Sequence, residues 1–504
     1  MSPDLLLMNC MKDRRINLKL LARQAMEKYG FEPDFPPKVI REVNRLPEES
    51  SIEPAGDIRD FRSLPWSSID NSDSEDLDQV EYCETRSNGE IRVLVAIADV
   101  DHFVKLGSNT DRHAAFNGTS VYLGIETFPM LPDRLSKGIS SLLPGRDRRA
   151  VVIEYTVLPD GSVKHGTIFR AIVRNHAKLV YEEVGDWLEK KASTPAGVSG
   201  VPGLEEQIRL QAEVSRRLRS HRMDQGALDL ETIEAEPVMR AGEVRGLVVR
   251  EQNAARQLIE EFMVAANGTM VHVLGAAHVP MVQRVVRVPK NWDGIVRTAE
   301  EFGFRLPPEP DSKALARFLD QRRRADPERF PDLSLTVVKL MGPGEYVPFV
   351  PGDTPIGHFA LAVLDYTHST APNRRYVDII NQRLLKAVLD REPMPYTPHE
   401  LARLAVHLTD RDKASEKAAR FMRKVAAAVL LADRTGQTFE AIVTGAAEKG
   451  TYVRLLDPPA EGRVVEGEKG LSVGNKVRVR LIRTDPENGF VDFAFVAMSA
   501  RKAA

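Results

Sequence analysis

The sequence predicts a multidomain α+β protein in which a mixed α/β body lies between a small helical segment and a C-terminal all-β barrel. With 504 residues, 42% hydrophobic and 28% charged, the chain is long enough for roughly two to four globular domains. Strand-like and helix-like patterns alternate from residue 65 to 434 without an internal repeat. From residue 435 the pattern changes to short strands interrupted by Gly and Pro.

Composition excludes several classes of protein. The net charge is only −2, so a polyanion would have to bind to local basic surfaces. Cys10 and Cys83 are too few for a disulfide framework or a thiolate zinc site, which indicates a reducing compartment and predicts a cytoplasmic location. The N-terminus lacks the regions of a signal peptide. The uncharged run 262–283 contains Asn, Gly, His and Pro, so we expect a buried helix and turn there and no membrane partner.

Residues 1–50 carry two short helical patterns. Asn17 can cap a first helix that ends at Gly30, and Pro37 begins a second. Two helices around a short turn, with a basic exterior, suggest a helix-turn-helix. The alternative is a small helical cap docked on the next domain. The polar, Pro-containing residues 51–64 are predicted to be a linker.

The body, residues 65–434, supplies the longest elements. Buried strands are expected at 91–99, 119–123, 150–157 and 167–174. Helices are expected at 203–221, 251–274, 310–324, 375–390 and 398–434. The basic residues of the last helix are typical of a solvated face.

An acidic stretch before the strand at 91–99 is the strongest candidate for chemistry. If residues 76–78 are extended, Asp76 and Asp78 share one face and Leu77 points to the other, while Asp70 can fold back from the preceding loop. Three carboxylates suit Mg²⁺ or Mn²⁺, ions that assist phosphodiester hydrolysis. The alternative is a solvated acidic loop.

The C-terminal region, residues 435–504, is expected to form a five-stranded OB-type barrel. Lys476, Arg478 and Arg480 alternate with Val and Leu, which predicts a strand with one basic and one apolar face. Such a face, with Tyr452 available for base stacking, is typical of barrels that bind single-stranded nucleic acid. The alternative is a basic edge strand protected against aggregation.

Several longer blocks resemble one family. They are VAIADVDHFV at 95–104, GTSVYL at 118–123, PMLPDRLSKGISSLLPGRDR at 129–148, AKLVYEEVGDWLE at 177–189, QGALDLET at 225–232, LIEEFMVAANGTM at 258–270 and YTHSTAPNRRYVDIINQRLLKAV at 366–388. With the acidic stretch, they resemble the RNB catalytic domain of the ribonuclease II and ribonuclease R exoribonucleases, in family order. The region after Gly436 resembles the S1-type domain of those enzymes. The front differs, because the family commonly begins with cold-shock barrels.

The resemblance implies processive 3′ to 5′ hydrolysis of single-stranded RNA to nucleoside 5′-monophosphates with Mg²⁺, or with Mn²⁺ in its place, and we expect a monomer. The acidic signature of the family falls on Asp70, Asp76 and Asp78, but Gln79 replaces its last Asp. An amide oxygen can ligate a cation but brings no charge. A second ion is therefore expected to bind weakly unless Asp73 compensates.

Four further residues carry over from the family. Arg374 matches the arginine that binds the phosphate near the cleaved bond; its alternative is a structural ion pair. Tyr122 matches the aromatic on which terminal bases stack; its alternative is a core tyrosine. Tyr181 and Glu261 match positions associated with the ribose 2′-OH, with helix packing as the alternative for both.

Two functions of different classes remain after this comparison. The first is a metal-dependent exoribonuclease, favoured by the joint presence of Asp70, Asp76, Asp78 and Arg374. The second is an RNA-binding protein on a disabled nuclease scaffold, suggested by Gln79. A DNA exonuclease is a weaker third hypothesis, because the candidate 2′-OH contacts favour RNA.

Overall fold

The computed structural model describes residues 16–48, 54, 56–231, 233, 235–249, 251–447 and 450–499. Its largest unit is a curled six-stranded sheet in the order β1-β8-β2-β3-β4-β7. The sheet curls because the long strand β8 pairs with β1 and β2 and also with β7. The strands are β1 (Arg59–Asp60), β2 (Trp66–Asp70), β3 (Gln79–Thr85), β4 (Ile91–Ala98), β7 (Asp147–Val157) and β8 (Val163–Val180).

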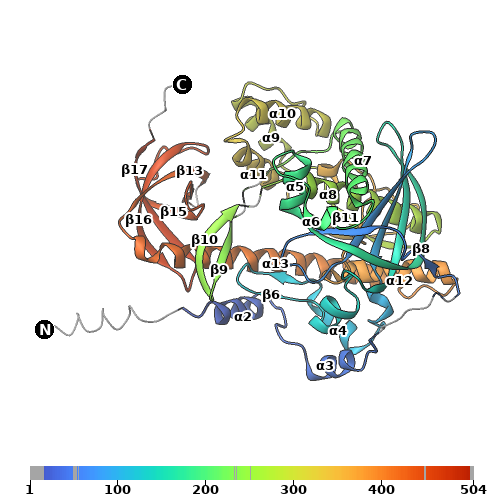
Figure 1. Ribbon diagram of the computed structural model, residues 1–504. Helices are drawn as coiled ribbons and strands as arrows, with labels where there is room; N and C mark the ends of the chain where they lie inside the picture. The colour runs from blue at the N-terminus through green and yellow to red at the C-terminus, as the bar shows by residue number, and fades with distance from the viewer. Residues whose placement is uncertain are drawn as a thin grey trace.

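Helices and short hairpins surround this sheet (Figure 1). The helices of the body are α4 (Asn109–Asn117), α5 (Tyr181–Leu188), α6 (Ala196–Ser199), α7 (Leu204–Asp224), α8 (Ala254–Ala276), α12 (Tyr376–Asp390) and α13 (Pro398–Leu431), with a π-helix at Arg134–Ile139 and 3₁₀ turns at Val100–His102, Phe359–Leu361 and Ala432–Arg434. The hairpins are β5 (Val121–Tyr122) with β6 (Thr127–Phe128), β9 (Ala235–Arg240) with β10 (Glu243–Val249), and β11 (Met281–Val285) with β12 (Glu345–Phe349). The strand expected at 119–123 is therefore reduced to two residues, whereas the long helices lie close to their expected positions.

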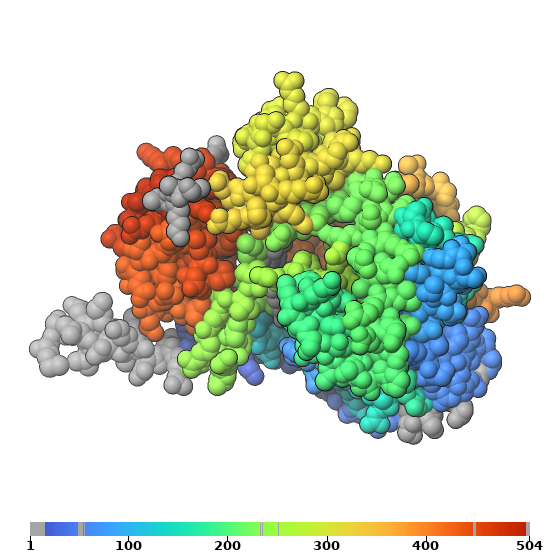
Figure 2. Space-filling view, turned by 45° about the horizontal axis from the view of Figure 1, so that its top comes forward, coloured from blue at the N-terminus to red at the C-terminus, as the bar shows by residue number. Residues whose placement is uncertain are grey.

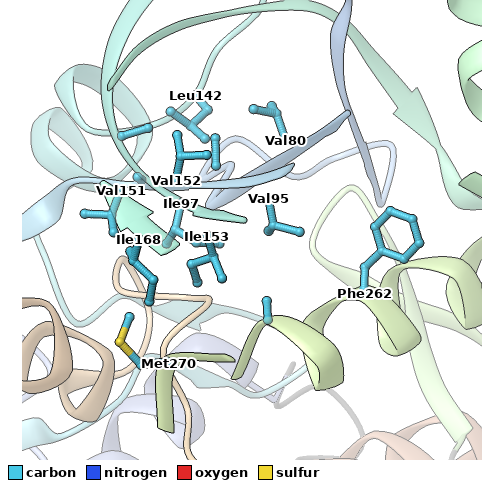
Figure 3. Close-up of a cluster of buried hydrophobic side chains, with 14 of the residues drawn as sticks. Val80, Val95, Ile97, Leu142, Val151, Val152, Ile153, Ile168, Phe262 and Met270 are labelled. Atoms are coloured by element: carbon cyan, nitrogen blue, oxygen red, sulfur yellow. The ribbon is translucent and has the colours of Figure 1, made fainter. Parts of the chain in front are cut away.

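The core lies between the sheet and α8. Val95 and Ile97 of β4 and Ile153 of β7 meet Phe262 and Met270 of α8 (Figure 3). All five side chains are nearly or fully buried. This burial explains why α8, which contains most of the uncharged run 262–283, is apolar. Within the described residues, no helix is both long and apolar enough to cross a bilayer.

The N-terminal helices form a cap. Asn17 caps α2 (Leu18–Lys28) by accepting a hydrogen bond from the Leu20 backbone at 3.0 Å, and Pro37 begins α3 (Pro37–Asn44). The apolar face of α2 packs against α13, whereas α3 packs against α4. The structure therefore favours the alternative to a helix-turn-helix, a small helical cap docked on the next domain, because α2 and α3 pack against different helices. Residues 1–15 of the segment lie outside the described part.

Glu42 of α3 fixes this cap to the N-terminus of α4. Its carboxylate accepts hydrogen bonds from the backbone and side chain of Asn109, at 3.0 and 2.9 Å, and of Thr110, at 3.0 and 2.6 Å. Burial opposes ionisation of Glu42, but these four hydrogen bonds outweigh it and lower its pKa from 4.5 to about 2. The free N–H groups of a helix N-terminus favour such an anion.

The segment predicted as a linker is partly structured. Arg59 and Asp60 form β1, which pairs in parallel with Ala171 and Ile172 of β8. The backbone of Phe61 also donates to Ile172. The sequence pattern did not predict this short strand, because two residues are too few to show the alternation of a strand. Residues 49–53 and 55 lie outside the described part.

A separate helical unit stands above the body. Its helices are α9 (Trp292–Glu301), α10 (Ser312–Ala325) and α11 (Phe330–Met341). They enclose a small core of their own around Ile295, Phe318 and Val337. Figure 1 shows this unit between α7 and the C-terminal barrel.

The C-terminal region is a closed barrel in the order β13-β14-β15-β17-β16. Its strands are β13 (Thr438–Ala447), β14 (Gly450–Leu455), β15 (Glu461–Glu466), β16 (Lys476–Asp485) and β17 (Phe490–Met498). The predicted five-stranded OB-type barrel is confirmed. In Figure 2 the molecule is hollowed between the red barrel, the yellow helical unit and the green part of the body.

Candidate active site

The acidic loop connects β2 to β3 and is anchored by its one apolar residue. Leu77 is buried, and its backbone N–H donates to the Ser141 hydroxyl at 2.9 Å while its carbonyl accepts from Leu142 at 2.9 Å. Asp70 ends β2 and accepts hydrogen bonds from the loop, including one from the Ser74 hydroxyl at 2.8 Å. The loop is therefore held at both ends, and Leu77 points into the core as its place between two aspartates predicts.

Asp76 and Asp78 differ in burial. Asp78 is 4% exposed, and its Oδ1 accepts from the Asn373 backbone at 2.9 Å. Burial raises the pKa of Asp78 well above its usual range, and the charge of Asp76 raises it further. Burial and the charge of Asp70 also raise the pKa of the half-buried Asp76, whereas Arg374 and Lys137 act in the opposite direction. The charge of Asp70 therefore opposes ionisation of Asp76, and the charge of Asp76 opposes ionisation of Asp78.

This donor set fits a hard divalent cation by its chemistry. A bound cation reduces the repulsion between neighbouring carboxylates, and ligand sets made only of oxygen atoms suit Mg²⁺ or Mn²⁺. In the part of the chain that the structure describes, no three His, Cys, Asp or Glu side chains lie close enough together to form a complete metal site by themselves. Asp70, Asp76 and Asp78 would be the ligands, with RNA phosphate oxygens able to complete the set.

Two adjacent arginines beside the loop have opposite environments. Arg375 is largely buried and forms a two-pronged ion pair with Asp378, with Nε–Oδ2 and Nη2–Oδ1 distances of 2.8 Å each. Arg374 is exposed, and its backbone carbonyl accepts from Ser120 at 2.9 Å and from the Thr119 hydroxyl at 3.0 Å. No ion pair joins the Arg374 guanidinium to another described residue, yet its charge acts on Asp76 and Asp78. The Arg374 guanidinium is therefore available to bind a phosphate. The structural ion pair that was the alternative role for Arg374 is formed by Arg375 instead.

Tyr122 lies next to these groups. Its side chain is 46% exposed, and its hydroxyl is 3.5 Å from Oδ2 of Asp76. Burial of the hydroxyl end, followed by the charge of Asp76, raises the pKa of Tyr122. An exposed ring whose hydroxyl meets the acidic loop is suited to stacking and not to core packing, so the structure favours the first of its two alternatives.

Tyr181 and Glu261 lie deeper. Tyr181 begins α5, and the Arg256 guanidinium lies over its ring at 4.4 Å from the centroid. Glu261 is 1% exposed and accepts from Nε and Nη2 of Arg222 at 3.0 and 2.6 Å. The Glu261 carboxylate is thus paired with an arginine within the body of the protein, and its contact with the ribose 2′-OH stays a prediction.

The barrel strand β16 has the predicted alternation. Val477 and Val479 are buried, whereas Arg478 and Arg480 are exposed. Lys476 instead donates to Glu328, next to the helical unit, at 2.7 Å. Nε of Arg478 lies 3.8 Å from Oε1 of Glu440. Among the described residues, Arg480 is the one of these three basic residues without an ion pair, so it is the best candidate for RNA contact.

The barrel is also tied to the helical unit by a buried ion pair. Arg454 of β14 and Asp332 of α11 are 5% and 4% exposed, and Nη2 of Arg454 lies 3.0 Å from Oδ1 of Asp332. Burial raises the pKa of Asp332, and Arg454 opposes that rise. Together with Lys476–Glu328, this pair joins the barrel to the helical unit.

Two supporting residues escaped the sequence analysis. Ser141 accepts from the Leu77 backbone and donates to the Glu75 carbonyl at 2.7 Å, so it shapes the acidic loop. Asn373 contacts Asp78 through its backbone and accepts from the Ser140 hydroxyl at 2.7 Å. Both lie in sequence blocks that resembled the family, which was the only available signal.

Fold and site together define a nuclease-type scaffold. An acidic loop, and an arginine without an ion-pair partner in the described part of the chain, lie together beside the curled sheet. Residues 58–391 match the RNB domain family, and residues 437–496 match the RNase II-type exonuclease C-terminal S1 domain. The chain belongs to the ribonuclease II and ribonuclease R family of exoribonucleases.

Relatives and solved structures agree with this assignment. The chain is 30% identical over 500 residues to ribonuclease R of Thermotoga maritima, covering 92% of this chain and 68% of that protein. It is similar in fold to the apo form of Mycoplasma genitalium RNase R, with a TM-score of 0.84, 23% identity, and coverage of 95% of this chain and 78% of that one. Yeast Ssd1, a pseudonuclease, also shares the fold, with a TM-score of 0.69, 16% identity, and coverage of 92% and 57%. The fold alone therefore does not decide activity.

Proposed function

We propose that this chain degrades single-stranded RNA processively from its 3′ end, releases nucleoside 5′-monophosphates, and uses Mg²⁺, with Mn²⁺ as an alternative ion. The observation that carries the proposal is the exposed Arg374, which lies beside Asp76 and Asp78 without an ion-pair partner among the described residues. A guanidinium can bind two phosphate oxygens at once and stabilise the charge that develops there during hydrolysis.

Each group has a distinct part in this reaction. Tyr122 stacks on a terminal base and so sets which phosphate faces the acidic loop. Arg374 holds that phosphate, and Asp70, Asp76 and Asp78 supply the negative charge that retains the cation. When bound, a divalent ion lowers the pKa of a water and stabilises the leaving oxygen.

One assay tests the proposal directly. The purified chain is incubated with 3′-tailed single- and double-stranded RNA and DNA in Mg²⁺, Mn²⁺ or EDTA, and products are sized and identified. We expect 5′-monophosphates from single-stranded RNA, no cleavage in EDTA, and retained RNA binding without cleavage in Asp78→Asn. Parent-level cleavage by Asp78→Asn would contradict this assignment of the site.

The second candidate is an RNA-binding protein that does not cleave. Gln79, in place of the last aspartate of the signature, favours it. Tight RNA binding by the parent with no cleavage in either metal would select this candidate. We also propose that the chain acts as a monomer in the cytoplasm, which light scattering and cell fractionation would test.

A further inference from the structure

Arg256, in the first turn of α8, contacts two other segments of the body. Its guanidinium carbon lies 4.4 Å from the centroid of the Tyr181 ring, at the start of α5. Its Nη2 donates to Oε1 of Glu182 at 2.6 Å and to Oδ1 of Asn71 at 3.4 Å. Its Nε is buried and has no hydrogen-bonding partner among the described residues. One arginine side chain therefore links α8 to α5 and to the loop that follows β2.

These contacts lie next to Asp70, the first of the candidate metal ligands. Asp70 accepts a hydrogen bond from the Asn71 backbone at 2.7 Å. It also pairs with Val180 in the parallel register of β2 and β8, and neighbouring strands lie about 4.8 Å apart. Arg256 contacts the residue that follows each member of this pair, because Asn71 comes after Asp70 and Tyr181 after Val180. The start of α5 and the start of the acidic loop are therefore neighbours, and one guanidinium contacts both.

The packing of α5 on the start of α8 holds Arg256 in this place. Asn253, the cap of α8, accepts from the Arg256 backbone at 2.9 Å and donates through Nδ2 to the Tyr181 carbonyl at 2.9 Å. Gly185 of α5 allows this approach, because a Cβ there would lie 2.4 Å from Nδ2 of Asn253. Only 19% of the Arg256 side chain is exposed. The guanidinium is therefore held between two packed helices and is not a flexible surface group.

The position of Arg256 leaves the hydroxyl of Tyr181 as the group that can meet RNA. The ring has the guanidinium over it and packs against the main hydrophobic core, so little of its face is left for a base. Burial, followed by the charge of Asp70, raises the pKa of the hydroxyl. The hydroxyl is therefore protonated at neutral pH and can donate a hydrogen bond. The 2′-OH of RNA can accept such a bond, whereas deoxyribose has no oxygen at that position.

We propose that Arg256 is a positioning residue for ribose recognition, which holds the Tyr181 ring beside the Asp70 end of the acidic loop so that the Tyr181 hydroxyl meets the 2′-OH of bound RNA. The proposal rests on the proposed function and on Tyr181 as the predicted ribose contact, and it adds a residue on which the selectivity for RNA depends. Arg256 acts through Tyr181 and not on the RNA itself. A guanidinium suits this role because it can lie over a ring and still hydrogen-bond in its own plane.

RNA binding without cleavage tests this proposal. Fluorescence anisotropy in EDTA measures the affinity of the full chain for a short 5′-labelled RNA and for the same oligomer with 2′-deoxyribose at its 3′ end. The parent should prefer the all-ribose oligomer by about 3–10-fold, the usual value of one hydrogen bond, and Arg256→Ala should lower this preference below about twofold. Arg256→Lys should recover only part of the preference, because an ammonium cannot lie flat on the ring and hydrogen-bond as a guanidinium does.

Two further variants show whether Arg256 acts through Tyr181. Arg209→Ala is the matched control, because the Arg209 guanidinium lies over the Trp187 ring of the same helix α5, at 4.7 Å, and pairs with Glu205 of α7 at 2.9 Å. This variant should keep the parent preference within about twofold. Tyr181→Phe should lose the preference as Arg256→Ala does. The double variant should bind the all-ribose oligomer no more weakly than Tyr181→Phe alone, because two changes that act through one group are not additive.

Three results would overturn the proposal, provided that the variants are folded by circular dichroism. They are a parent without a ribose preference, an unchanged preference in Arg256→Ala, and a double variant whose loss of affinity is the product of the two single losses. If Arg256→Ala does not fold, Arg256→Lys decides: a reduced preference supports the proposal, and a parent-level preference refutes it.

The binding assay also separates this proposal from the proposed function, because it needs no cleavage. A parent whose ribose preference is lost in Arg256→Ala, but which cleaves no RNA in Mg²⁺ or Mn²⁺, would refute the exoribonuclease proposal and leave this one standing. A parent that cleaves RNA, with the preference kept in Arg256→Ala, would refute this proposal alone.

Discussion

Replacing each of the two adjacent arginines should separate catalysis from stability. Arg374→Ala removes an exposed guanidinium with no described ion-pair partner, so the free energy of unfolding should change by less than about 0.5 kcal/mol. Loss of a preorganised charge at the phosphate should instead lower kcat by about 10²–10³-fold. Arg374→Lys should recover only part of this, because an ammonium cannot bind two oxygens in the same fork geometry.

The matched control, Arg375→Ala, should show the reverse pattern. It leaves Asp378, which is 0% exposed, without its two 2.8 Å contacts to the guanidinium. Removing one partner of a buried ion pair costs about 3–5 kcal/mol. Urea unfolding and single-turnover cleavage of a short 5′-labelled RNA measure the two quantities. Parent-level kcat in Arg374→Ala, or a loss of stability in that variant as large as in Arg375→Ala, would refute the reasoning.

Three further predictions concern the base stack, the cap and the barrel. Tyr122→Ala should leave a longer final fragment than Tyr122→Phe, because stacking is worth about 1–3 kcal/mol per base; identical product ladders would contradict it. Glu42→Gln should destabilise the chain by about 1–3 kcal/mol at pH 7. Since the folded pKa of Glu42 is about 2 instead of 4.5, its contribution is complete above 4.5 and disappears as pH falls toward 2, so an equal effect at pH 7 and pH 2.5 would exclude this cause. Arg480→Gln should reduce the salt slope of RNA binding by about 0.7 for the lost phosphate contact, whereas Lys476→Gln and Arg478→Gln should change it less, because Lys476 is paired with Glu328 and Arg478 with Glu440.

Local pattern was enough to predict the long elements. The helices expected at 375–390 and 398–434 correspond to α12 (Tyr376–Asp390) and α13 (Pro398–Leu431), because each has a clear apolar period. Helix α13 also has Thr397 as its cap and Pro398 at its first position. The alternation in β16 likewise predicted its buried and exposed faces. These features depend on neighbours within a few residues, which a single sequence displays.

Features that depend on distant partners could not be predicted. Nothing local distinguishes Arg374 from Arg375, since the choice depends on which guanidinium meets Asp378 after the turn. The sequence gives no sign that Arg222 pairs with Glu261, the candidate ribose contact, because the two residues lie on different helices. Glu81 alternates like a solvent-facing strand residue, and only the sheet and α7 bury it.

The length of α13 has a consequence for how the chain is divided. Its 34 residues extend about 50 Å at 1.5 Å per residue, and one buried cluster along it joins Leu18, Val121, Val244, Ala418 and Val453. That cluster combines α2, the β5–β6 and β9–β10 hairpins, and the barrel. The barrel that matches the S1 domain and two hairpins within the RNB match therefore share one buried cluster. Cutting the chain between the two matched regions would expose apolar surface on both fragments. We therefore expect each fragment to be less stable alone than within the whole chain.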